Sequence, residues 1–131
     1  MIFALTAWNS YGWDDEYFNI GLLEEGEPLL QLIKHVNSFD VHPAGQYVIN
    51  FLLYRTAGSW RAVRAIGAVI AAAALWLYWL DGLKDKGIMS VLFSYVVFCL
   101  NPSVLLWCTG IRWYTWMMPL MCLFRYLFDL N

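Results

Sequence analysis

Residues 65–80 read AIGAVIAAAALWLYWL, and residues 87–111 read GIMSVLFSYVVFCLNPSVLLWCTGI. Neither stretch contains a charged side chain. A helix needs about 20 apolar residues, within a range of about 17–25, to cross the hydrocarbon core of a bilayer. The second stretch meets this requirement outright, and the first meets it when Arg64 snorkels from its end to the interface. Both stretches therefore favour an integral membrane protein.

A third apolar stretch, WYTWMMPLMCLF at residues 113–124, follows Arg112 and is closed by Arg125. A buried helical hairpin of a soluble protein is the alternative interpretation. Three such stretches would then need a much larger polar layer to cover them than this chain contains. We therefore expect three transmembrane helices, near residues 62–80, 88–108 and 113–128.

The composition of the whole chain points the same way. Of its 131 residues, 61% are hydrophobic and 14% are charged, and the mean hydropathy is +0.54. An ordinary soluble domain is about 45–50% apolar and about 25% charged. The net charge of −2 provides no basic field that would attract nucleic acid. We expect an all-α integral membrane fold whose partner is membrane lipid and not nucleic acid.

The first part of the chain is more polar than the rest. We expect residues 1–61 to form an extracytoplasmic loop with an acidic motif and short amphipathic juxtamembrane helices. Residues 62–131 then form the transmembrane helical region. The N-terminal run MIFALTAW has no basic segment and no cleavage site, and we interpret it as the stump of a span whose beginning is missing.

Two short apolar segments lie within this first part. One is an amphipathic helix of about two to three turns, suited to a membrane surface. The residues that share its apolar face are Leu29, Leu30, Ile33 and Val36. The other segment, YVINFLLY at residues 47–54, is too short to cross a bilayer, and we expect it to pack at the interface.

Two carboxylates and a histidine in this part are candidate catalytic or ligand-binding residues. Asp15 and Glu16 stand between aromatic residues, and desolvation beside a membrane raises the pKa of a carboxylate toward the value that a general base requires. The alternative is a solvated acidic turn. His42 precedes Pro43, which favours an extended backbone that presents the imidazole to a ligand or a metal ion. The alternative is a ring in water.

Arginines at the ends of the apolar stretches have two interpretations. Arg64 and Arg112 either anchor spans by snorkelling or bind a phosphate group. The three cysteines have spacings that fit no zinc motif, so we interpret them as small core residues; they are Cys99, Cys108 and Cys122.

Several spaced motifs resemble one family. They are WDDEY at residues 13–17, DVHPAGQY at 40–47, Arg64 at the start of a span, Asn101-Pro102, and Arg112-Trp113-Tyr114. In this order they resemble the GT-C-type membrane glycosyltransferases, in particular the family-39-like branch related to protein O-mannosyltransferases and to lipopolysaccharide and lipid A sugar transferases. The chain lacks the acidic residue that often precedes the last arginine of this pattern.

The resemblance implies an inverting transfer of a sugar from a polyprenyl-phosphate donor to an acceptor on the extracytoplasmic side of a bacterial plasma membrane. Asp15 would be the catalytic base, with Glu16 beside it. Glu16 and His42 would orient the acceptor or hold a divalent cation. Arg64 and Arg112 would stabilise the charge on the departing lipid phosphate, and Tyr114 belongs to the same substrate-binding set.

Members of this family are much larger, with many more spans. We therefore expect the chain to be the N-terminal part of such an enzyme, inactive without the missing remainder. The alternative function is a small non-catalytic membrane protein that assembles with a partner. A channel or transporter has little support, because no ionisable residue lies in the middle of an expected span.

Overall fold

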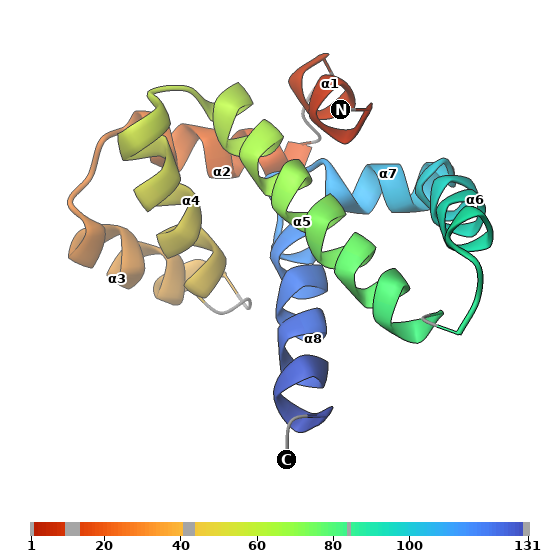
Figure 1. The fold of residues 1–131 in the computed structure, drawn as a ribbon. Helices are drawn as coiled ribbons and strands as arrows, with labels where there is room; N and C mark the ends of the chain where they lie inside the picture. Colours follow the sequence, from red (N-terminus) through yellow and green to blue (C-terminus); the bar gives the residue numbers. More distant parts are fainter. Residues whose placement is uncertain (1, 10–13, 41–43, 84, 130–131) are drawn as a thin grey trace.

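The computed structural model describes residues 2–9, 14–40, 44–83 and 85–129. Every regular element in these ranges is an α-helix, which confirms the expected all-α class. Figure 1 shows their arrangement. In chain order the helices are α1 (Ile2–Asn9), α2 (Asp14–Glu24), α3 (Leu29–Phe39), α4 (Gly45–Ala57), α5 (Trp60–Gly82), α6 (Ile88–Cys99), α7 (Pro102–Cys108) and α8 (Trp113–Asp129).

Helix α5 is the centre of the fold. It packs against α1, α4, α6, α7 and α8. In Figure 1 the helices α2, α3 and α4 lie on one side of α5, and α6 and α7 lie on the other. The N-terminal run forms α1, which packs on α5 with Ala7 fully buried.

Small side chains allow these helices to approach one another. Ala68 and Ala71 of α5 are fully buried and form a core with Ala7 of α1. Cys99 and Cys108 belong to the same core, as expected, whereas Cys122 of α8 is only partly buried. Small residues lower the distance between helix axes and so increase van der Waals contact.

Among the described residues, α5 is the helix long and apolar enough to cross a membrane, over Trp60–Asp81. A second candidate exists only if α6 and α7, which are bent by 77° relative to each other, count as one broken span. The straight helix expected over residues 88–108 is therefore two helices. The third expected span corresponds to α8, which has 17 residues and is not among these candidates.

The break between α6 and α7 has a local cause. Asn101 is the N-cap of α7, and its side chain accepts a hydrogen bond of 2.9 Å from the Ser103 backbone N–H. Pro102 follows at the first helical position, where it has no N–H to donate to the preceding turn. The Asn-Pro pair therefore ends one helix and starts another in a new direction.

Helix α3 is the amphipathic helix that we expected, but its buried face differs from the expected one. Leu32 and Val36 are buried, whereas Leu30, which we expected on that face, is 73% exposed. The buried pair packs with Leu22 of α2 and Tyr47 of α4. The apolar stripe of α3 is wide enough to be oriented in two ways, and contact with α2 and α4 selects the face centred on Leu32.

The packing of α5 on α8 predicts a sensitive glycine. A Cβ atom at Gly67 would lie 3.1 Å from Cγ2 of Thr115 and 3.5 Å from the ring of Trp116. Gly67→Leu should therefore lower the free energy of unfolding in detergent micelles by about 1–3 kcal/mol, the usual cost of overpacking. The control is Gly21→Leu in α2, where an added Cβ meets nothing within 4 Å. Equal stability of the two variants, measured by tryptophan fluorescence, would contradict this packing.

Candidate functional site

A buried ion pair connects α2 to α5. One guanidinium nitrogen of Arg64 lies 3.4 Å from Oε2 of Glu16, and the two side chains are only 3% and 4% exposed. Arg64 Nε donates a second hydrogen bond, of 3.0 Å, to the Thr109 carbonyl. The other carboxylate oxygen of Glu16 accepts a bond of 2.6 Å from the Ile111 backbone N–H. The pair therefore also fixes the loop between α7 and α8.

This loop approaches Glu16 so closely that only glycine fits at its centre. A Cβ atom at Gly110 would lie 2.8 Å from Glu16 Oε1, which is closer than real Cβ contacts. The hydroxyl of Thr115 donates to the Gly110 carbonyl at 2.7 Å and so holds the loop from the α8 side. Glu16, Gly110 and Thr115 together set the position of the residues that follow in the loop.

A cavity of about 290 Å³ opens beside this ion pair. Arg112 lines it and follows Ile111, whose backbone N–H is bound by Glu16. The remaining lining comes from α2, from the end of α3 and from the start of α4. These residues are Phe18, Asn19, Phe39, Asp40, Gln46 and Tyr47.

The cavity wall contains a buried hydrogen-bond acceptor that the described residues leave unsatisfied. Gln46 is 6% exposed, and its Nε2 donates a bond of 3.2 Å to Oδ1 of the buried Asn19. Its Oε1 accepts no hydrogen bond from any described residue. Because buried polar atoms in native proteins are normally paired, this oxygen is an exception among the described residues.

A phenol and a carboxylate form another part of the wall. The hydroxyl of Tyr47, a residue only 3% exposed, donates to Oδ2 of Asp40. Burial, together with the hydrogen bond to Asp40, raises the pKa of Tyr47 above its usual value. Tyr47 is therefore a neutral donor at physiological pH, and it orients the Asp40 carboxylate.

The structure brings together some of the expected site residues. Glu16 and Arg64 contact each other, and both oxygens of Glu16 are already engaged by the protein. Arg112 lines the cavity. Tyr114 packs its ring against Trp107 and Trp113, with centroid distances of 4.2 and 4.1 Å.

Two expected residues fall partly or wholly outside what the structure describes. The backbone of Asp15 lies in the first turn of α2, next to Glu16, but its side chain is not described. His42 lies outside the described residues. The roles of both residues stay predictions.

The sequence analysis did not single out three lining residues, Asp40, Gln46 and Tyr47. All three belong to the DVHPAGQY segment, whose histidine was selected instead. The available signal was the polar Gln46 directly before the apolar run that begins at Tyr47.

Comparison with known proteins gives no relative: no family model, no curated protein and no solved structure matches this chain. The function must therefore be argued from the residues of the site.

The buried ion pair predicts a large effect of removing one charge. Glu16→Gln leaves Arg64 buried without its counter-charge, which should destabilise the protein by about 3–5 kcal/mol in detergent. Glu24→Gln, which changes an exposed residue of the same helix, should have little effect. The double variant Glu16→Gln/Arg64→Met should lose less unfolding free energy than the two single variants lose together. Strictly additive losses in unfolding measurements would argue against the pair.

Tyr47 predicts a pH dependence of stability. The folded chain retains the phenolic proton beyond pH 10, whereas the unfolded chain loses it with a pKa of about 10. The resulting stabilisation is complete below about pH 10 and declines as the pH rises further. Tyr47→Phe has no such proton, so its unfolding free energy should fall less steeply than that of the wild type above this pH. Parallel curves in denaturant titrations across this pH range would refute the assignment.

Proposed function

We propose that this chain is a membrane glycosyltransferase module that binds the phosphate and sugar of a polyprenyl-phosphate donor in the cavity beside Arg112. The observation that carries the proposal is the presence of Arg112 in the wall of a cavity lined by polar and aromatic side chains, in a chain that also contains the long apolar helix α5. Guanidinium groups recognise phosphate with charge-assisted, bidentate hydrogen bonds. The apolar helix offers a surface for the prenyl chain.

The membrane arrangement of this proposal uses α5, the bent pair α6–α7 and α8 as spans, with residues 1–61 on the extracytoplasmic side of a bacterial plasma membrane. Large apolar side chains on the outer surfaces of these helices support it. Leu77, Met89, Phe93, Phe124 and Phe128 are each between 59% and 76% exposed. In the proposed arrangement, lipid would cover these exposed apolar side chains.

The cavity has the mixed lining that small polar ligands require. Phe18 and Phe39 contact each other edge to face at 4.9 Å and supply apolar surface at its edge. Gln46 Oε1 offers an acceptor for a hydroxyl, and Arg112 offers a cation. A few polar groups within an apolar wall are typical of sites that orient a ligand.

In the proposed reaction the acceptor hydroxyl attacks the anomeric carbon of the sugar. A bond forms between the acceptor oxygen and this carbon, and the bond from the carbon to the phosphate oxygen breaks. The phosphate leaves with the electron pair, and Arg112 stabilises its charge. Asp15 takes the hydroxyl proton, and His42 and Tyr114 complete the binding set. Glu16 and Arg64 position the Arg112 loop, since they are engaged with each other.

The proposal predicts binding that depends on phosphate and on Arg112. The purified chain in non-ionic detergent should bind a polyprenyl phosphate more tightly than the polyprenol of the same length, as followed by tryptophan fluorescence. Arg112→Gln should weaken binding of the phosphate by about 10- to 100-fold, because hydrogen bonds to charged groups are worth about 1.5–3 kcal/mol.

The matched control is Arg125→Gln, at the opposite end of α8, which should leave the affinity unchanged. Equal binding of phosphate and alcohol by the wild type would reject the proposal and favour the alternative, a non-catalytic membrane protein that assembles with a partner. An affinity of the Arg112→Gln variant equal to that of the wild type would reject the assignment of Arg112.

A further inference from the structure

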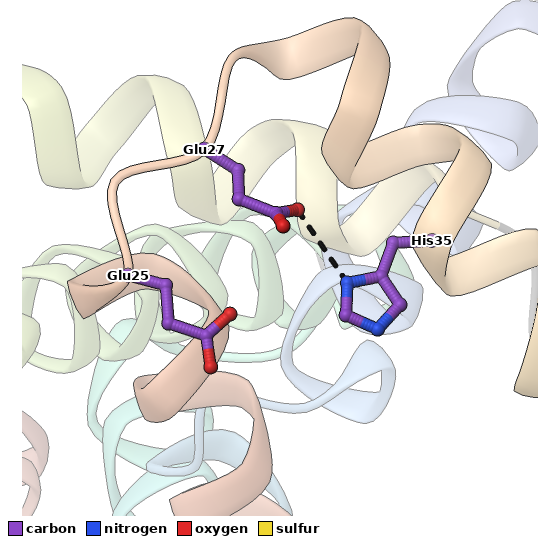
Figure 2. Close-up of side chains that lie close together, drawn as sticks. All are labelled: Glu25, Glu27 and His35. Carbon is purple, nitrogen blue, oxygen red and sulfur yellow. Dashed lines mark hydrogen bonds and ion pairs between the residues drawn. The ribbon is translucent and has the colours of Figure 1, made fainter.

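The turn between α2 and α3 gathers three side chains that can bind a metal ion. Figure 2 shows Glu25 and Glu27 converging with His35 of α3. The Nδ1 atom of His35 lies 3.4 Å from Oε2 of Glu27, and the ligand atoms of all three residues lie within 4.8 Å of one another. This cluster is distinct from the cavity and from the Glu16–Arg64 pair.

The backbone of the turn holds these residues together. Gly26 adopts a left-handed conformation, with φ of 71°, which reverses the chain between the two glutamates. Arg55 of α4 donates a hydrogen bond of 3.2 Å to the Gly26 carbonyl. The ring of His35 packs edge to face on Phe39, with centroids 5.2 Å apart. These contacts hold the turn against α4 and the imidazole against Phe39.

The geometry fits a tetrahedral metal ion. At zinc–ligand bonds of about 2.0–2.1 Å, two ligand atoms on a tetrahedron lie about 3.4 Å apart. The separation of His35 Nδ1 and Glu27 Oε2 has this value. Glu25 is exposed, and its carboxylate oxygen lies within 4.8 Å of the ligand atoms of the other two residues. Two carboxylates also supply the negative charge that a divalent cation needs.

We propose that Glu25, Glu27 and His35 bind a divalent transition-metal ion of the zinc type, with water as the fourth ligand. One imidazole with two carboxylates favours such an ion over magnesium or calcium, which prefer sites made of oxygen alone. The ion connects the C-terminal end of α2 to α3. Because Phe39 contacts His35 and also lines the cavity, the ion braces one wall of that cavity.

The test uses the full chain in detergent, without a histidine tag, titrated with Zn²⁺ in a calorimeter. Wild type should bind one ion per chain at this site and should unfold at a higher temperature in its presence. His35→Ala and Glu27→Gln should each weaken binding by at least about tenfold, the lower limit for changes to groups that merely support a ligand. The control Glu24→Gln changes the residue just before the cluster, and it should bind Zn²⁺ with the affinity of the wild type.

A ligand swap separates metal binding from damage to the fold. Glu27→His keeps a donor at the same position and should retain Zn²⁺ binding, whereas Glu27→Gln should not. Circular dichroism without metal should be the same for both variants. Absence of saturable Zn²⁺ binding by the wild type would overturn the proposal, as would equal affinities of wild type, His35→Ala and Glu27→Gln. The two proposals have separate readouts, because this test measures Zn²⁺ binding and the test of Arg112 measures polyprenyl-phosphate binding without added metal.

Discussion

A carboxylate and a guanidinium that are both withdrawn from solvent constrain the rest of this molecule. Burying Glu16 and Arg64 is costly unless their geometry and remaining hydrogen bonds are satisfied. The Thr109 carbonyl and the Ile111 N–H satisfy them, so α2 and α5 can pack only when the loop before α8 is also in place. The glycine at position 110 is a consequence of this contact, and so is the position of Arg112.

Several polar and charged side chains are buried in this molecule, while many large apolar side chains lie on its surface. Glu16, Arg64 and Asn50 are buried among the helices, and Asn50 accepts a hydrogen bond of 3.0 Å from Trp116. Large apolar side chains on α6 and α8 instead face outward. The interior polar contacts connect helices that are distant in the sequence and so help to specify which helices pair.

The two proposed sites share one structural support. Phe39 ends α3, lines the cavity and contacts both Phe18 and His35. Any change at the turn between α2 and α3 therefore reaches the cavity through a single aromatic side chain. In our proposal, a metal ion at the turn would act on the cavity through this connection without touching a bound ligand.

The sequence alone determined the helical class and the long helix α5, because charge-free apolar runs and small residues act locally. It also contained the signal for the break at Asn101-Pro102, although a continuous span was expected there. Only the tertiary structure decided which face of α3 is buried and which residues line the cavity. It alone paired Glu16 with Arg64, which are 48 positions apart. The sequence around a charged residue does not identify its ion-pair partner, because that partner is set by how distant helices pack.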